Sequence, residues 1–97
     1  MKPSAFIINV ARGPIIKEAD LIEALENGVI AGAALDVQEV EPPSKDNPLF
    51  GMQNVIMTPH IGWKAFEARQ RLIELTARNI DAFLQGKPVN VVNQGEA

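Results

Sequence analysis

The residues best suited to chemistry are charged or titratable side chains that each follow a short apolar run. They are Arg12, Asp36, Glu41 and His60, the only histidine. If the apolar runs are neighbouring parallel strands, their carboxyl ends meet at one edge of a sheet, where open α/β sheets bind ligands. The sequence therefore predicts that these four side chains gather at one edge.

The four residue types together suggest one kind of reaction. A carboxylate beside an imidazole fixes its tautomer and favours its charged form, which suits a general acid. An arginine can hold a carboxylate substrate through two parallel hydrogen bonds. The set therefore fits a small carboxylic acid with a reacting oxygen atom.

Each residue also has a plainer interpretation. A lone histidine or arginine after a strand is usually a surface or capping residue. Glu41, in a proline-rich loop, is most simply solvated, and Asp36 could just cap a turn. Only the combination of Arg12, Asp36, Glu41 and His60 favours a site over these alternatives.

Apolar runs and helical periodicity predict the elements that position these residues. Strands are expected at 4–10, 31–35 and 55–57, and helices at 17–27 and 64–85. The unbroken apolar run at 5–8 is typical of a parallel strand covered on both faces. The small residues of 31–35 indicate close approach by a helix or a ligand. The order is β-α-β-β-α.

Composition limits the class of protein. The 97 residues are 46% hydrophobic and 22% charged with a net charge of −3, which excludes a disordered chain. No basic block indicates nucleic-acid binding, and no apolar run reaches the roughly 18 residues of a membrane span. The absence of cysteine excludes disulfides and thiolate metal sites. We expect a cytoplasmic protein with no metal site.

Four ordered motifs resemble a known family. They are Asn9–Gly13, Gly32–Val37, Glu41–Pro42 and Thr58–Gly62. At this spacing, the sequence resembles the C-terminal portion of the NAD-dependent D-isomer-specific 2-hydroxyacid dehydrogenases, over nearly the whole chain to about Asn93. Further segments resemble the glycerate dehydrogenase (hydroxypyruvate reductase) branch; they are Trp63, Glu67–Leu72, Gly86–Pro88 and Asn90–Asn93.

The resemblance implies catalytic roles for three residues. Arg12 would bind the substrate carboxylate and carbonyl groups. His60 would be the acid/base that protonates the carbonyl oxygen as hydride arrives, and Glu41 would pair with His60. The substrate would be a small 2-oxo or 2-hydroxy acid, with hydroxypyruvate/glycerate first.

The resemblance also implies a nicotinamide cofactor, NAD, with NADP not excluded. Asp36 would hold the nicotinamide carboxamide, and the Ala11 backbone and Gly62 would lie near the ring. With Arg12 and His60, these residues make up the expected cofactor-binding set.

The expected organisation is part of a larger protein. Residues 1–63 would be the second half of a Rossmann-like parallel sheet, 64–85 a long helix leading to a substrate domain, and 86–97 a tail. No G-x-G-x-x-G is present, and the resemblance places the pyrophosphate-binding turn upstream of Met1. We therefore expect the 97 residues alone to be inactive, to bind NAD(H) weakly and to self-associate, and the full-length enzyme to be a homo-oligomer.

Two other function classes remain open. One is a non-catalytic dinucleotide sensor or corepressor, which the same family contains. The other is a purely structural, self-associating fragment. Turnover by a full-length protein separates the first from an enzyme, and solution mass tests the second.

Overall fold

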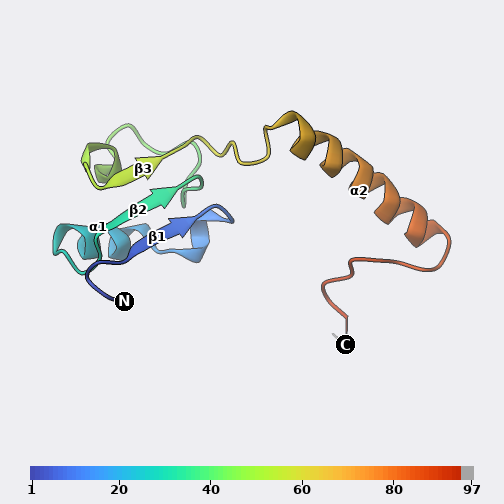
Figure 1. The fold of residues 1–97 in the computed structure, drawn as a ribbon, viewed down its shortest axis with the longest axis horizontal. Helices are drawn as coiled ribbons and strands as arrows, with labels where there is room; N and C mark the ends of the chain where they lie inside the picture. The colour runs from blue at the N-terminus through green and yellow to red at the C-terminus, as the bar shows by residue number, and fades with distance from the viewer. Residues whose placement is uncertain (95–97) are drawn as a thin grey trace. The chain divides into compact units, whose positions relative to one another are not determined.

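The computed structural model describes residues 1–94 and divides the chain into two compact units, Met1–Gly62 and Trp63–Ala97. The elements are β1 (Phe6–Asn9), α1 (Glu18–Glu26), β2 (Gly32–Leu35), β3 (Val55–Met57) and α2 (Phe66–Leu84), with 3-10 helices at Gly13–Ile15 and Pro48–Gly51 (Figure 1). The predicted α/β order, β-α-β-β-α, is confirmed.

The three strands form a parallel sheet in the order β1-β2-β3. Backbone pairing continues just past the strand ends. Asp36 N–H donates to the carbonyl of Asn9 at 3.0 Å, and Thr58 N–H donates to the carbonyl of Leu35 at 2.9 Å. This register brings the residues that follow each strand to one edge of the sheet, as predicted.

Helix α1 covers one face of the sheet. Leu21 and Leu25, one helical turn apart, belong to the same buried cluster as Ala33, Leu35 and Leu49. The helix ends in a Schellman motif, in which Gly28 adopts the left-handed conformation with a φ of 66°. In this motif, Val29 N–H donates to the Ala24 carbonyl at 2.9 Å.

Val29 lies just past that helix end. The apolar periodicity of the first helix extends to Val29, yet Val29 lies beyond α1 and is exposed. The αL residue Gly28 turns the chain away from the helical path before Val29. Val29 therefore contributes its backbone N–H to the helix end, and its side chain is not part of the core cluster.

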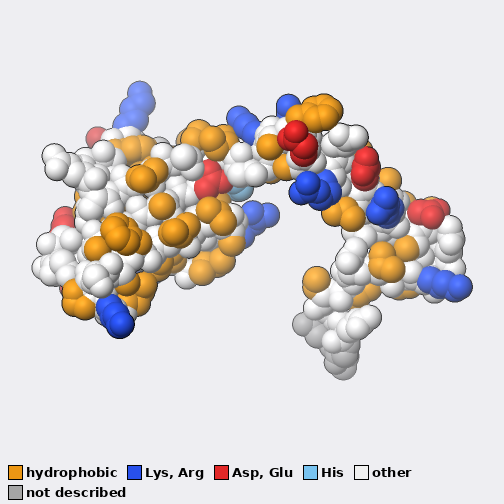
Figure 2. All heavy atoms as spheres, viewed as in Figure 1, with side chains coloured by type: hydrophobic (Ala, Val, Ile, Leu, Met, Phe, Trp, Pro, Cys, Tyr) orange, Lys and Arg blue, Asp and Glu red, His pale blue; other side chains and the backbone are white. Residues whose placement is uncertain are grey.

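The other face of the sheet is open. Phe6 and Ile8 of β1 and Ile56 of β3 are 66%, 69% and 67% exposed. Figure 2 shows hydrophobic side chains over this unit. In the described residues α1 covers one side of β1 only, so the apolar run of this strand has one covered and one exposed face.

Close packing between neighbouring strands accounts for the glycine of β2. A Cβ atom at Gly32 would lie 2.5 Å from the carbonyl oxygen of Asn54 and 2.9 Å from the ring of Phe6. At Gly32 the close neighbours are therefore the backbone just before β3 and a side chain of β1. The helix approach that the small residues indicated is found at Ala33, which is buried in one cluster with Leu21 and Leu25 of α1.

The unit that begins at Trp63 contains helix α2. Its C-terminal end is a second Schellman motif, in which Gly86 has a φ of 75° and Lys87 N–H donates to the Ala82 carbonyl at 2.9 Å. No residue of α2 is buried. Over residues 1–94, no helix is long and apolar enough to cross a membrane.

Candidate active site

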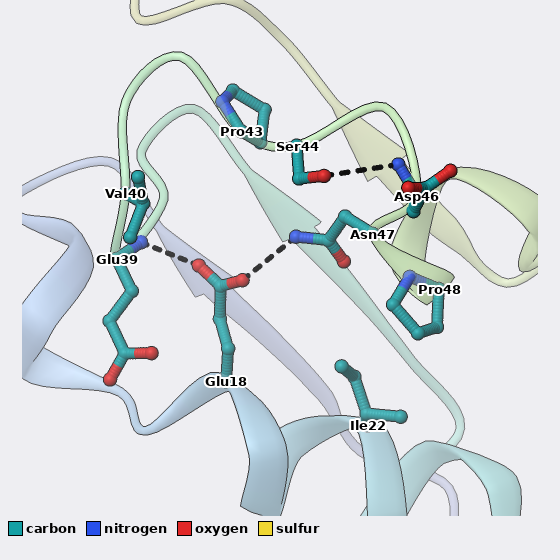
Figure 3. Close-up of a pocket in the computed structure, with 9 residues that line it drawn as sticks. All are labelled: Glu18, Ile22, Glu39, Val40, Pro43, Ser44, Asp46, Asn47 and Pro48. Carbon is teal, nitrogen blue, oxygen red and sulfur yellow. Dashed lines mark hydrogen bonds between the residues drawn. The ribbon is translucent and has the colours of Figure 1, made fainter.

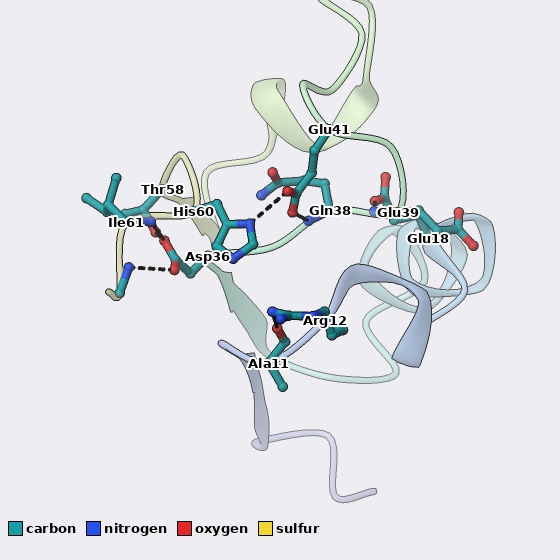
Figure 4. Close-up of polar contacts among 11 residues, drawn as sticks. Ala11, Arg12, Glu18, Asp36, Gln38, Glu39, Glu41, Thr58, His60 and Ile61 are labelled. Carbon is teal, nitrogen blue, oxygen red and sulfur yellow. Dashed lines mark hydrogen bonds and ion pairs between the residues drawn. The ribbon is translucent and has the colours of Figure 1, made fainter. Parts of the chain in front are cut away.

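His60 and Glu41 form a hydrogen-bonded pair at the carboxyl edge of the sheet. His60 Nδ1 lies 2.7 Å from Glu41 Oε2, and each side chain is about one-third exposed. An ionised carboxylate only accepts hydrogen bonds, so Nδ1 carries the hydrogen in this pair. Figure 4 shows that the two side chains come from different loops (Figure 4).

The Glu41 carboxylate is held in its ionised form. The hydrogen bond from His60 does most to lower the pKa of Glu41, followed by the hydrogen bond that Gln38 N–H donates to Oε1 at 3.0 Å. The charges of His60 and Arg12 lower this pKa further. The three residues are thus close enough for their charges to matter to one another.

Asp36 holds the turn that carries His60. Its Oδ1 accepts from the Thr58 hydroxyl at 2.6 Å and from Ile61 N–H at 2.9 Å, and its Oδ2 accepts from Gly62 N–H at 2.9 Å. These hydrogen bonds flank His60, whose φ of 57° lies in the left-handed region. Such a conformation costs roughly 1–2 kcal/mol in an L-residue, and the three hydrogen bonds offset it.

The same hydrogen bonds lower the pKa of the buried Asp36. The Thr58 hydroxyl has the largest effect, then Ile61 N–H; burial acts in the opposite direction, and Gly62 N–H and the charge of His60 add to the lowering. Asp36 is therefore a turn-capping carboxylate, which is the plainer of the two interpretations of its sequence position. It also lies at the site, because the turn that it caps presents His60.

Asn9 organises the loop that carries Arg12. Its side chain accepts from Ala11 N–H at 3.1 Å and donates to the carbonyl of Arg12 at 2.9 Å. The guanidinium of Arg12 is exposed and donates to the Ala11 carbonyl at 2.8 Å. This hydrogen bond uses one of the five N–H donors of the guanidinium, so its Nε–Nη2 edge can still donate two parallel hydrogen bonds to a carboxylate.

Gly13 brings the Arg12 loop against the loop that leads to Glu41. A Cβ atom at Gly13 would lie 1.8 Å from the carbonyl oxygen of Gln38. Only a residue without a side chain allows this approach. The close packing of the two backbones therefore sets the separation of Arg12 and Glu41.

Three positioning residues were not recognised as such from the sequence. Asn9 was noted as the end of a strand and the first residue of the Asn9–Gly13 motif, but not for its side chain, although Asn often hydrogen-bonds the backbone two residues on. Thr58 belongs to the Thr58–Gly62 motif, but its hydrogen bond to Asp36 spans 22 residues, which no local pattern predicts. Gln38 donates to Glu41 through its backbone N–H, so its residue type gave no signal of this contact. Within residues 1–94, Gln38 Nε2 is a buried nitrogen without a hydrogen-bond partner, and Gln38 lines a cavity of about 200 Å³ beside His60 and Glu41.

The residues at this edge fit a nicotinamide carboxamide. A carboxylate offers about four acceptor positions, and the hydrogen bonds to Asp36 use three of them. The remaining position is on Oδ2, beside Gly62, and could accept one amide N–H. A side chain at Gly62 would crowd this oxygen, because its Cβ atom would lie 3.1 Å away.

A family model matches this arrangement. The family is described as D-isomer specific 2-hydroxyacid dehydrogenase, NAD binding domain, and its model matches residues 1–62. The match covers well over half of the chain. The chain belongs to this family. The resemblance drawn from the four sequence motifs and the Rossmann-like fold are thus confirmed.

Known proteins are similar over nearly the whole chain. The hydroxypyruvate reductase of Blautia hydrogenotrophica is 50% identical over 94 residues, covering 97% of this chain and 29% of that protein. The glyoxylate reductase of Pyrococcus furiosus is 50% identical over 95 residues, covering 97% of this chain and 28% of that protein.

A solved structure shows the same fold. The acyclic imino acid reductase Bsp5, in complex with NADPH and D-arginine, has a TM-score of 0.79 at 41% identity. The similarity covers 95% of this chain and 29% of that one. The chain therefore spans less than a third of the length of these relatives.

Proposed function

We propose that a protein of the relatives' length that contains these 97 residues, called the full-length protein below, reduces a small 2-oxo acid to the D-2-hydroxy acid. The observation that carries this proposal is the 2.7 Å contact between His60 Nδ1 and Glu41 Oε2, with Arg12 at the same edge of the sheet. A bound NADH or NADPH supplies the hydride. The chain's own residues supply the proton and hold the substrate.

In this proposal His60 is the general acid. Glu41 binds Nδ1, so the proton passed to the substrate oxygen is held on Nε2. The ionised Glu41 stabilises the charged imidazole and fixes its tautomer. In the reverse reaction, Nε2 accepts the hydroxyl proton of the 2-hydroxy acid.

Arg12 recognises the carboxylate of the substrate. Its planar guanidinium can donate two parallel hydrogen bonds to that group. Hydroxypyruvate is the first choice of substrate, with glyoxylate or pyruvate behind it. The hydroxypyruvate and glyoxylate reductases among the relatives support this order.

The second candidate is a non-catalytic dinucleotide sensor. It is supported by the fact that Asp36 and Gly62 could bind a carboxamide without any chemistry at His60. A sensor needs neither the His60–Glu41 contact nor the Arg12 charge beside it. The structure has both, which favours the enzyme.

A substrate panel tests the proposal. The full-length protein is assayed with NADH and NADPH against hydroxypyruvate, glyoxylate, pyruvate and a bulky aliphatic 2-oxo acid. We expect turnover, with the highest kcat/KM for hydroxypyruvate. Cofactor binding without turnover would favour the sensor, and a preference for the bulky acid would contradict the assigned substrate.

A further inference from the structure

A carboxylate outside the pair ties down both ends of the loop that carries Glu41. Glu18, the first residue of α1, accepts a hydrogen bond from Glu39 N–H on Oε2. Its Oε1 accepts from Asn47 Nδ2 at 3.0 Å. Glu39 precedes Glu41 and Asn47 follows it, so the loop between them closes on one side chain (Figure 3).

The other hydrogen bonds of this loop are those of the Glu41 carboxylate with Gln38 N–H and His60, and local ones from Asp46 N–H and Asn47 N–H to Ser44. Between Glu39 and Asn47 it contains no helix or strand. A cavity of about 340 Å³ lies between this loop and α1, lined by both and by Glu18 itself. Where a cavity replaces packed side chains, dispersion contacts are lost. The two hydrogen bonds to Glu18 therefore fasten the loop to α1 across this cavity.

Asn47, the second hydrogen-bond partner of Glu18, is itself held by a core residue. Asn47 Oδ1 accepts from Leu49 N–H at 3.0 Å, and Leu49 is 1% exposed. The Asn47 amide is thus oriented by its oxygen, and its nitrogen points to Glu18. In this hydrogen bond the Asn47 nitrogen is therefore the donor and the Glu18 carboxylate is the acceptor.

We propose that Glu18 is a positioning residue for Glu41. By closing the loop at Glu39 and Asn47, it keeps the Glu41 carboxylate at hydrogen-bond distance from His60. Glu18 touches neither substrate nor cofactor in this proposal. The inference rests on the proposed function, because its effect is measured as turnover.

An exchange of donor and acceptor tests the proposal in the full-length protein. In Glu18→Gln, one of the two accepting oxygens is replaced by an NH₂ group. This group then faces a donor, either Asn47 Nδ2 or Glu39 N–H, and one of the two hydrogen bonds is lost. In Asn47→Asp, two carboxylates face each other. In the double variant, the new glutamine amide can donate to the new aspartate, while the aspartate still caps Leu49 N–H. The double variant keeps the net charge of the wild type.

We expect each single variant to lower kcat by about 10- to 100-fold, since small misplacements of catalytic groups have effects of that size. KM for the 2-oxo acid should change much less, because Arg12 is untouched. The acid limb of the kcat/KM profile should move to higher pH, since a displaced Glu41 loses the hydrogen bonds that lower its pKa. The double variant should restore kcat and the pH profile.

Glu23→Gln is the matched control, since Glu23 lies on α1 and is exposed. It should leave kcat and the pH profile unchanged. If one single variant does not fold, the comparison uses the other one and the double variant. Single variants with wild-type kcat and pH profile, or a double variant no better than its parents, would overturn the positioning role. An inactive wild type would instead overturn the proposed function.

Discussion

Asp36 shows how one side chain can serve structure and function together. Its three hydrogen bonds close the turn from Thr58 to Gly62 and hold His60 in a left-handed conformation. One acceptor position on Oδ2 remains for a ligand. The residue that orients His60 is thus the residue expected to bind the cofactor carboxamide. Asp36 would therefore fix the position of the proton donor relative to the nicotinamide that carries the hydride.

The lowered pKa of Asp36 gives a stability prediction with a definite sign. A carboxyl group with a depressed folded-state pKa stabilises the fold above its unfolded pKa, and this stabilisation is lost as the pH falls through the folded-state pKa. The unfolding free energy of the full-length protein should therefore fall below about pH 4, the ordinary aspartate range.

Urea unfolding at several pH values, with Asp36→Asn and the control Asp46→Asn, measures this effect. Asp46 is exposed, and its side chain makes none of the hydrogen bonds found at Asp36. We expect Asp36→Asn to be less stable at neutral pH and to show a weaker loss on acidification, with some loss remaining from Glu41. Equal pH dependence in all three proteins would contradict the role of Asp36.

Arg12 gives a second prediction at the level of a residue. Arg12→Lys keeps the charge but loses the planar pair of donors. We expect kcat/KM for hydroxypyruvate to fall by about 10- to 100-fold, equivalent to roughly 1.4–2.7 kcal/mol of transition-state binding. Steady-state kinetics on the full-length protein measures this change. A lysine variant as efficient as the wild type would argue against recognition by two hydrogen bonds.

Among the structural elements, the loops after the strands do most to build the site. Gly13 lets the loop after β1 pack directly against the backbone at Gln38. Glu18 ties the Glu41 loop to α1, and Asp36 ties the His60 turn to β2. The strands supply a common edge, and hydrogen bonds between loops set the distances along it.

Gly13→Ala tests this packing. Its Cβ atom would lie 1.8 Å from the Gln38 carbonyl oxygen, so the two loops must separate. We expect a loss of about 1–3 kcal/mol in unfolding free energy, typical of overpacking, with a fall in kcat. Gly51→Ala is the control, because nothing lies within 4 Å of a Cβ atom there. Equal stability and turnover in the two variants would contradict this account of the loops.

The sequence patterns predicted the elements better than the contacts between them. Val55–Met57 matched the expected strand, and the expected helix 17–27 contains α1 with one flanking residue at each end. Periodicity and turn residues are local signals, and they were sufficient for this. The hydrogen bonds of Glu18 reach across 21 and 29 residues, and no local pattern predicts them.

The sequence pattern of a strand does not say which element covers each of its faces. An apolar run such as Ala5–Ile8 shows that a strand can be buried on both faces, but not what covers each face. In the described residues α1 covers one face, and Phe6 and Ile8 on the other remain exposed. The self-association expected from the sequence stays a prediction, and the exposed face of β1 with Phe6 and Ile8 is the surface proposed for it.

For the molecule as a whole, we predict that the 97 residues alone self-associate. The open face with Phe6, Ile8 and Ile56 is an apolar patch of the kind that becomes an interface. Light scattering at several concentrations should show a mass that rises with concentration. Ile8→Thr, which keeps a β-branched side chain, should reduce this rise. A monomer at every concentration would contradict the prediction.

The same sample should bind NADH only weakly. The 97 residues contain no G-x-G-x-x-G to hold a pyrophosphate. Titration with NADH should therefore show no saturation in the micromolar range. Saturable micromolar binding would mean that Asp36 and its neighbours hold the cofactor without that turn.

The central claim is that His60, paired with Glu41, transfers the proton in a 2-oxo acid reduction. The most direct test is kcat for hydroxypyruvate in the full-length His60→Gln variant, with NADH affinity and Tm measured as checks on folding. Glutamine keeps a polar side chain but cannot act as an acid near neutral pH. We predict that kcat falls by about two to four orders of magnitude while NADH affinity and Tm are retained. A variant that turns over at nearly the wild-type rate would contradict the claim.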